Sequence, residues 1–337
     1  MTATFAFDPH APAFYQDPYP TYAQLRDQAP VARVPGDSEL WFVTTWELVR
    51  EALMDPRRFS NVFPPARRDT PPPEVAAEVE ALRAQGLPYS SALGTSDPPV
   101  HTRYRRMVNR AFVPRALAKM AEAVDEVSSD LVGALPDGEV VDIMERLTVP
   151  LPVWAIMRIL GVNDAYRGEL RQWSAAATAA MGSKLTPEQW LQTERDTLRF
   201  QQVMRELLAE HRANPREGDL LSALVAPDED GHALNDGELL WLVRELIVAG
   251  NETTVRSLAA MIVDIDALHQ KDPLVWDRLR DDEAFRRGVV EESIRMASPV
   301  MGLWRVTTQD VELGGVRIPA GASVFLAYGS ANRDDTV

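Results

Sequence analysis

The chain has 337 residues, of which 45% are hydrophobic and 25% charged, an ordinary globular composition that argues against disordered, collagen-like and low-complexity proteins. Its 35 basic and 50 acidic residues give a net charge of −15, which argues against a nucleic-acid binder and against docking on an anionic membrane. Cysteine is absent, which excludes disulfides, cysteine-ligated metals and cysteine nucleophiles within these residues, and the five scattered histidines make a histidine-built metal site a poor hypothesis.

The N-terminal hundred residues combine short helices with strands. The predicted elements are a helix over 20–28, a hairpin of strands 31–34 and 39–44, a helix over 46–54 and a short helix near 74–84. The last of these lies in a proline-rich connection, 63–99, and connections of that length in a compact domain are usually functional or mobile.

From Val100 onward the pattern is helical almost without interruption. A segment of about 35 residues, 235–269, contains no proline and exceeds the usual helix length, so we expect it to run through the protein centre. Further helices are predicted over 273–279 and 283–297, followed by strands over 311–313, 316–318 and 323–327. The sequence therefore predicts one mainly α domain, with a helical body over about 98–298 and β-rich parts near 31–44 and 303–327.

No segment resembles a membrane span or a leader. The longest apolar stretches are interrupted by charged residues and fall short of the roughly 20 residues that a span requires. The first 16 residues lack a basic region followed by an apolar one. We expect a soluble, cytoplasmic protein.

The first chemical signal is the sequence AGNETT, residues 249–254, in the middle of the longest predicted helix. Glycine in a helix interior costs about 1 kcal/mol relative to alanine, and threonine hydroxyls can bond back to the carbonyl four residues earlier. A weak polar patch in a buried helix indicates a local opening of functional significance. The alternative is a helix–helix contact made through small residues.

Three further signals are weak when each is considered alone. Glu292 and Arg295 are three residues apart on one helix and can pair, which on a surface means little. His101 and Arg105 share a helix face after a Pro-Pro pair and can clamp an anion, or else they belong to a solvated basic helix. Arg305 lies among apolar residues at a strand start, where a lone arginine is usually an edge charge.

Together, in this order and spacing, these signals resemble the cytochrome P450 family of haem-thiolate monooxygenases in its bacterial form. The family carries A-G-x-[DE]-T-T beside the haem, matched by 249–254, and ExxR on a later helix, matched by Glu292 and Arg295. It also has an H-x-x-x-R after D-P-P, matched by His101 and Arg105, and an arginine before a small hairpin, matched by Arg305. The final A-N-R-D, 331–334, matches the family as well, so the resemblance covers the chain from about residue 17 to its end.

The resemblance implies haem b, iron protoporphyrin IX, as cofactor and assigns a role to each match. His101, Arg105 and Arg305 would neutralise the haem propionates. Ala249 and Gly250 would let the helix backbone approach the haem, while the carboxyl group of Glu252 and the hydroxyl group of Thr253 would deliver protons to dioxygen. Glu292 and Arg295 would have a structural role beneath the haem.

One departure from the family pattern concerns the iron ligand. In the family, the cysteine that ligates iron lies several dozen residues beyond A-N-R-D, and this chain has no cysteine at all. We therefore expect a C-terminally truncated member that is inactive as given, with no metal ligand of its own. Whether it binds haem is left open by the sequence.

The substrate pocket is predicted to be lined by the 63–99 connection, Val248, the 181–185 turn and residues 300–302, which include Met301. These residues are mostly apolar, so a hydrophobic substrate is expected, such as a terpenoid, steroid, fatty acid or macrolide. Glu245 lies one turn before Ala249, so it either presents a carboxylate to this pocket or pairs with a neighbouring arginine.

The implied electron donor is a ferredoxin or flavodoxin, both small and acidic, which the net charge of −15 should repel. A local positive patch is then needed, and Arg103, Arg106 and Arg110 form a basic stripe on the helix that carries His101. The alternative is that these arginines pair with local carboxylates. The competing hypothesis for the whole chain is a non-catalytic helical protein, derived from the family, that binds an apolar ligand or a partner without haem.

Overall fold

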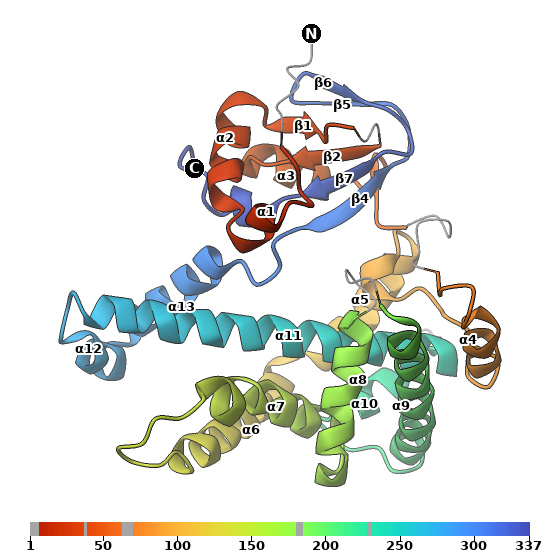
Figure 1. Cartoon of the computed structure of the whole chain (residues 1–337). Helices are drawn as coiled ribbons and strands as arrows, with labels where there is room; N and C mark the ends of the chain where they lie inside the picture. Colours follow the sequence, from red (N-terminus) through yellow and green to blue (C-terminus); the bar gives the residue numbers. More distant parts are fainter. Residues whose placement is uncertain (1–6, 37–38, 63–69, 180–184, 228–230) are drawn as a thin grey trace. The chain divides into compact units, whose positions relative to one another are not determined.

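The computed structural model describes residues 7–36, 39–62, 70–179, 185–227 and 231–337 (Figure 1). The chain divides into two compact units, the first made of residues 1–65 and 256–337 and the second of residues 66–255. The division falls inside the long helix α11 (Asp236–His269), whose bounds agree with the predicted segment 235–269. The predicted mainly α fold with a small β region is confirmed, whereas a single domain stays a prediction.

The first unit contains a five-stranded sheet in the order β1-β2-β7-β4-β3 and a separate hairpin, β5–β6. Strands β2 and β7 are parallel, with Phe42 opposite Phe325, and the other neighbouring strands are antiparallel. The predicted N-terminal hairpin therefore shares one sheet with the C-terminal strands. The bounds are β1 Val31–Arg33, β2 Leu40–Val43, β3 Phe59–Ser60, β4 Leu303–Thr307, β5 Val311–Leu313, β6 Val316–Ile318 and β7 Ser323–Leu326.

The two faces of this sheet bury different side chains, as the alternation of a strand requires. Trp41 and Val43 of β2 pack in one cluster with residues of β7, whereas Phe42 between them packs in a second cluster with Tyr22. Helices of the first unit are α1 Pro12–Gln16, α2 Tyr19–Gln28, α3 Trp46–Leu53, the C-terminal part of α11, α12 Val275–Asp281, α13 Glu283–Ala297 and α14 Tyr328–Ala331.

Gly302, just before β4, is a position where only glycine fits. A Cβ atom there would lie 2.4 Å from the carbonyl oxygen of Leu326 and 2.4 Å from the ring of Phe325. Real Cβ atoms do not approach other atoms so closely. The close approach of β4 to β7 thus depends on the missing side chain.

The second unit is helical, as the pattern after Val100 predicts. Its helices are α4 Ala76–Arg83, α5 Val100–Ala111, α6 Pro114–Gly133, α7 Pro150–Leu160, α8 Arg167–Ala179, α9 Pro187–Ala213, α10 Leu220–Val225 and the N-terminal part of α11. The described residues of this unit also form the 3₁₀ turns Leu93–Thr95 and Asp164–Tyr166 and the π turn Met144–Thr148.

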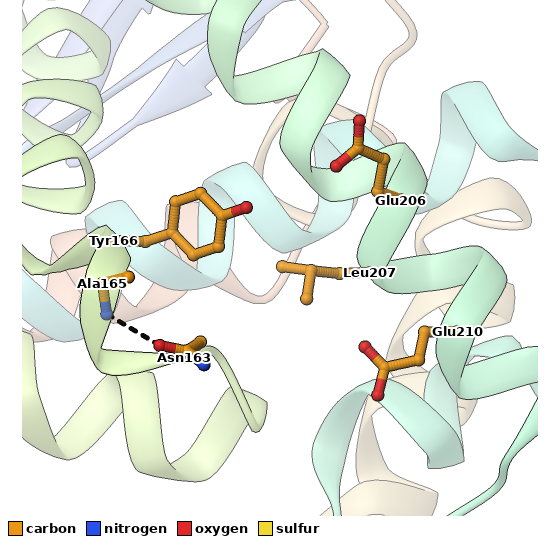
Figure 2. Close-up of a pocket in the computed structure, with 6 residues that line it drawn as sticks. All are labelled: Asn163, Ala165, Tyr166, Glu206, Leu207 and Glu210. Carbon is orange, nitrogen blue, oxygen red and sulfur yellow. Dashed lines mark hydrogen bonds between the residues drawn. The ribbon is translucent and has the colours of Figure 1, made fainter.

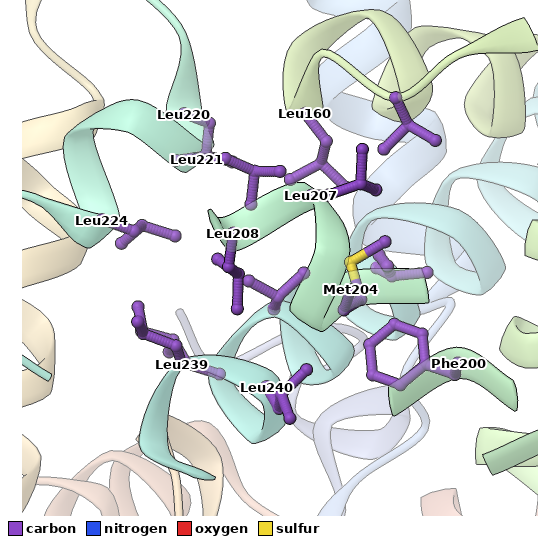
Figure 3. Close-up of a cluster of buried hydrophobic side chains, with 14 of the residues drawn as sticks. Leu160, Phe200, Met204, Leu207, Leu208, Leu220, Leu221, Leu224, Leu239 and Leu240 are labelled. Carbon is purple, nitrogen blue, oxygen red and sulfur yellow. The ribbon is translucent and has the colours of Figure 1, made fainter. Parts of the chain in front are cut away.

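The core of the second unit is rich in leucine, and Figure 3 shows its centre, where α9, α10 and α11 meet. Leu239 and Leu240 of α11 and Leu208 of α9 are at most 1% exposed. The N-terminal half of α11 is therefore a core helix. By length and composition, α11 is also the one helix in the described ranges that could cross a membrane, but this is weak evidence because core helices of soluble proteins have the same properties.

A buried polar pair joins the end of α9 to the start of α10. His211 is 0% exposed; its Nδ1 lies 2.7 Å from the Leu207 carbonyl oxygen and its Nε2 lies 3.1 Å from Asp219 Oδ2. Asp219 also caps α10, accepting hydrogen bonds from the backbone N–H and hydroxyl of Ser222. Gly161, the left-handed C-cap of α7, leaves room for both groups, because a Cβ there would lie 3.1 Å from each.

Candidate functional site

The AGNETT segment lies near the middle of α11, in the second unit. Ala249 and Gly250 are exposed, although they are far from either helix end. The hydroxyls of Thr253 and Thr254 donate to the carbonyl oxygens of Ala249 and Gly250, at 2.5 and 2.8 Å. These bonds have the i to i−4 form that the sequence suggested, and they leave a small, uncovered stretch of helix with threonine hydroxyls beside it.

Asn251 is the member of this segment that the sequence analysis did not single out. It is 3% exposed, and its side-chain N–H donates to the hydroxyl of Ser174 on α8 at 2.8 Å. The residues four and eight positions away in the same row of the helix, Val243, Ile247 and Val255, are buried as well. The buried spacing was available from the sequence, since Asn251 continues an apolar i, i+4 row.

Glu245 belongs to the neighbouring row of α11, which runs through Trp241, Glu245 and Ala249. Its carboxylate accepts a hydrogen bond from the backbone N–H of Gly94 at 2.9 Å and one from the hydroxyl of Thr95 at 3.4 Å. Burial raises the pKa of Glu245, although these hydrogen bonds and the charge of Arg244 oppose that shift. Instead of a salt bridge, the structure shows a contact with the connection that precedes α5.

His101 and Arg105 lie one turn apart on α5, as predicted. His101 is half-buried and Arg105 is exposed. Within the described ranges, neither side chain has a hydrogen-bond or ion-pair partner, so both remain able to bind an anion.

Two of the three arginines in the basic stripe of α5, Arg103 and Arg110, donate hydrogen bonds to other parts of the second unit. Arg103 binds Glu238 through two hydrogen bonds of 2.5 and 3.3 Å, and Glu238 also completes the cap of α11 with Asn235. Hydrogen bonds from Arg103 and Asn235 outweigh burial and lower the pKa of Glu238. Arg110 donates to the Pro227 carbonyl at 2.9 Å, whereas Arg106 is exposed. Local pairing, the alternative to a docking patch, thus accounts for Arg103.

Arg305 is the third predicted anion ligand and lies on β4 in the first unit. It is only 9% exposed, and its guanidinium donates to the Trp304 carbonyl oxygen at 2.8 Å. Burial raises the pKa of the neighbouring Tyr328 hydroxyl, and the Arg305 charge and hydrogen bond oppose this. No carboxylate pairs with Arg305 among the described residues. A buried cation without a counter-ion is costly, so the position favours an anionic ligand.

The Glu292–Arg295 pair forms on α13 in the first unit. Arg295 Nε donates to Glu292 Oε2 at 2.7 Å, a second hydrogen bond joins the same side chains, and Arg295 also donates to the Asn332 carbonyl oxygen. The hydrogen bond from Arg295 lowers the pKa of Glu292. Side-chain exposures of 45% and 60% make this a solvent-screened pair in the described structure, so its own contribution to stability is small.

The A-N-R-D tail holds other elements of the first unit together. Asn332 donates to the hydroxyl of Ser298, the residue that ends α13, at 2.9 Å. Arg333 lies over the ring of Tyr19, 3.6 Å from its centroid. Asp334 accepts the backbone N–H of Trp46, the first residue of α3, at 2.9 Å. The tail therefore has a structural function that motif matching alone did not reveal.

The predicted pocket residues are only partly within the described ranges. Residues 63–69 of the proline-rich connection and 181–184 of the predicted turn lie outside them. Val248 is half-buried on α11. The thioether of Met301 lies 3.9 Å from the hydroxyl of Tyr19, and it packs against Gly329. Pocket-facing roles for Val248 and Met301 stay predictions.

A surface cavity of about 340 Å³ lies elsewhere in the second unit (Figure 2). Tyr166 and Asn163 line one side, and Leu207, Glu206 and Glu210 of α9 line the other. It contains none of the predicted site residues. Among the residues that the structure describes, no three histidine or acidic side chains gather as a metal site would.

Comparison with known sequences identifies similar proteins along nearly the whole chain. A family model described as cytochrome P450 matches residues 181–337. Cytochrome P450 107B1 of Saccharopolyspora erythraea is 34% identical over 96% of this chain and 76% of its own length. The 6-deoxyerythronolide B hydroxylase of the same organism is 33% identical over 97% and 78%, and the monooxygenase PikC of Streptomyces venezuelae is 36% identical over 95% and 72%.

Solved structures give the same result. Cytochrome P450 CYP109Q5 from Chondromyces apiculatus matches with a TM-score of 0.78 and 29% identity, over 100% of this chain and 79% of that one. The cytochrome P450 PksS of Bacillus subtilis matches with a TM-score of 0.79 and 26% identity, over 98% and 79%. The chain thus spans about three quarters of the length of these proteins.

Proposed function

Because the chain belongs to the cytochrome P450 family, we propose that its function is that of a haem-dependent monooxygenase, which inserts one oxygen atom of O₂ into a hydrophobic small molecule. The observation that carries this proposal is the AGNETT segment of α11. It combines an exposed pair of small residues, Ala249 and Gly250, with the side chains of Glu252 and Thr253 in the middle of a long helix. Glycine, asparagine and threonine lower the stability of a helix interior, and binding of oxygen at this surface would explain their presence there.

Part of the chain fits haem and part does not. Arg305 is buried without a carboxylate among the described residues, and His101 with Arg105 supplies a second unpaired cationic group, so all three suit the propionates. The thiolate that binds iron in the family has no donor here, because the 337 residues include no cysteine. We therefore propose that the chain as given is inactive in monooxygenation.

When it is bound with a thiolate ligand, haem supplies the electron density that cleaves the O–O bond. The roles proposed for this chain are binding, orientation and proton delivery. Arg305, and His101 together with Arg105, would bind the haem propionates. The Glu252 carboxyl group would relay protons, and the Thr253 hydroxyl, oriented by its bond to the Ala249 carbonyl, would pass them toward oxygen.

The relatives favour a hydrophobic substrate without selecting one. Their names include a 6-deoxyerythronolide B hydroxylase, a vitamin D(3) 25-hydroxylase and a linalool 8-monooxygenase. We propose a terpenoid, steroid, fatty acid or macrolide for this chain. Electrons would come from a ferredoxin or flavodoxin, and Arg106, the exposed member of the basic stripe, is the residue best placed to contact it.

Haem titration of the 337-residue chain tests the cofactor assignment. Arg305→Leu should weaken haem binding about tenfold or more, since a hydrogen bond to a charged group contributes about 1.5–3 kcal/mol. Stability without haem should not fall, because the substitution removes a buried charge that has no carboxylate partner among the described residues. Soret absorbance gives the affinity, and thermal unfolding gives the stability.

The matched control is Arg287→Leu on α13, which removes an arginine whose side chain is 79% exposed and pairs with Glu283. This control should leave haem affinity unchanged. Equal affinities for wild type and Arg305→Leu would remove Arg305 from the haem site. With carbon monoxide, the reduced chain should lack the red-shifted Soret band of a thiolate ligand, because no thiolate is present.

Thr253→Ala is expected to separate electron consumption from product formation. In a form extended to include a cysteine-bearing haem loop, loss of the Thr253 hydroxyl should leave reductant consumption intact and divert more of it to peroxide, because a proton donor group is missing. The measurement is the ratio of product to reductant consumed. An unchanged ratio would exclude Thr253 from proton delivery.

The alternative is a family-derived protein that binds an apolar ligand or a partner without haem, and the absence of cysteine is the observation in its favour. Reading the encoding DNA beyond Val337 distinguishes the two. A continuous reading frame leading to an F-G-x-G-x-H-x-C-x-G segment supports the enzyme, whereas a natural stop codon there supports the alternative.

A further inference from the structure

The connection between α4 and α5 includes residues 87–96, here called the strap. Three side chains from α9 and α11, here called the anchors, bind the strap. The first anchor is Gln201 of α9, which is 7% exposed. Its carbonyl oxygen accepts the N–H of Leu87 at 2.7 Å, and its N–H donates to the Leu87 carbonyl oxygen at 3.3 Å. Gly86 makes this contact possible, because a Cβ there would lie 2.5 Å from the Gln201 side-chain oxygen.

The second anchor is Trp241 of α11. Its indole N–H donates to the Pro88 carbonyl oxygen at 2.8 Å, and its ring lies 4.9 Å from that of Tyr89, centroid to centroid. The guanidinium of Arg244, one turn further along α11, lies over the Trp241 ring, 5.1 Å from its centroid. The indole thus fixes the first part of the strap.

The third anchor is Glu245, one turn after Trp241. One carboxylate oxygen accepts the N–H of Gly94 at 2.9 Å and the other accepts the Thr95 hydroxyl at 3.4 Å. The same hydroxyl accepts the N–H of Ala92 at 3.1 Å and the Tyr89 hydroxyl at 2.9 Å. The hydrogen bonds at the end of the strap therefore converge on the Thr95 hydroxyl, and Glu245 links this hydroxyl to α11.

Two of the anchors, Trp241 and Glu245, lie on the helix that carries the AGNETT segment. Trp241, Glu245 and Ala249 are spaced four residues apart on α11, and the strap ends at Ser96, five residues before His101 on α5. We propose that Glu245 is a positioning residue that holds the strap against α11 and so fixes one wall of the substrate pocket, an inference that rests on the proposed function for the pocket itself. Substrate entry then requires release of the Gly94 and Thr95 contacts.

Proton binding should be linked to strap closure. Burial raises the pKa of Glu245 in the closed strap, and exposure on opening returns it to its ordinary value. The closed strap therefore binds more protons, so closure is favoured at low pH and weakens as pH rises through the raised pKa. The charge of Arg244, the next residue back on α11, lowers the pKa of Glu245 and so opposes the effect of burial. Arg244 in turn interacts electrostatically with Tyr89 of the strap and with Glu194 of α9.

Hydrogen exchange of the 337-residue chain, followed by mass spectrometry, tests the role of Glu245. In Glu245→Leu, peptides covering the strap should exchange about tenfold faster, the factor for a lost hydrogen bond of about 1.4 kcal/mol. Glu245→Gln keeps an acceptor for the Gly94 N–H and should restore most of the protection. Glu206→Leu makes the same change at an exposed position of α9 and should have no effect on the strap.

The pH profile is a second readout that a purely structural role would not change. After correction for intrinsic exchange, strap protection in the wild type should fall as pH rises above the ordinary range of glutamate, and it should be independent of pH in Glu245→Gln. Strap exchange that is unchanged in Glu245→Leu, or that accelerates no more than exchange of the α9 core, would overturn the proposal. Because no haem or substrate is used, this result is independent of the haem titration, which tests the function itself.

Discussion

Replacing His211 with leucine should lower the free energy of unfolding by about 3 kcal/mol. Removing one partner of a buried polar pair leaves the other without compensation, and such losses are among the largest single-site effects. Here the Asp219 carboxylate, 3.1 Å from His211 Nε2, would lose its neighbour in a site where the imidazole is 0% exposed. The junction of α9 and α10 should loosen first, since Asp219 also caps α10.

Urea unfolding followed by circular dichroism measures this change. His10→Leu is the matched control, because His10 is exposed and the same substitution there removes no buried contact. Asp219→Asn provides a second variant that keeps the cap of α10 and removes only the charge. A loss below about 1 kcal/mol in His211→Leu would show that the buried pair contributes little to the second unit.

Gly302→Ala should destabilise the first unit by about 3 kcal/mol, the upper part of the range for overpacked sites. The added methyl group would lie 2.4 Å from a backbone oxygen of β7 and 2.4 Å from the Phe325 ring. A flexible side chain can move away, but the Leu326 carbonyl is fixed by the sheet, so β4 itself must shift. Arg305, three residues along β4, would be displaced with it, and haem affinity should fall together with stability.

Gly288→Ala, in the same unit, is a control for which we expect the opposite change in stability. Gly288 lies inside α13, nothing lies within 4 Å of the position that its Cβ would take, and alanine is the better helix former. This variant should be more stable by up to about 1 kcal/mol. If both alanine variants unfold at the same denaturant concentration, the close approach of β4 and β7 does not depend on Gly302.

The local elements were predictable because their signals are local. The bounds of α13 agree with the predicted 283–297, where Asp282 caps the N-terminus and Pro299 follows the C-terminus. The Gly-Gly pair at 314–315 identified the β5–β6 hairpin. By contrast, the parallel pairing of β2 with β7 joins residues about 280 positions apart, which no local pattern encodes. The four-residue helix α14 is too short to show a period and was not predicted.

The sequence predicted those site residues that belong to a motif of fixed spacing. It did not predict the contacts that depend on residues far apart in the chain. His101, Arg105 and the Glu292–Arg295 pair were found by spacing, and their helix faces are as expected. Arg305 was singled out as a lone arginine at a strand start, and its role came from the resemblance. Its burial without a carboxylate partner among the described residues needed the structure. Glu245 was expected to face a pocket or an arginine, but its partners are a backbone N–H and a hydroxyl 150 residues away. Such partners have no sequence signature.

The two rows of α11 can be altered independently. Val243, Ile247, Asn251 and Val255 are buried, whereas Trp241, Glu245, Ala249 and Thr253 are not. Directed evolution toward a new substrate should therefore concentrate its diversity on the second row and the strap, keeping Thr253 for chemistry and leaving the first row intact. A library built on the buried row would yield mostly unfolded clones, because substitutions there disturb the core and the Asn251–Ser174 bond. One helix thus separates the positions that can change specificity from those that keep the protein folded.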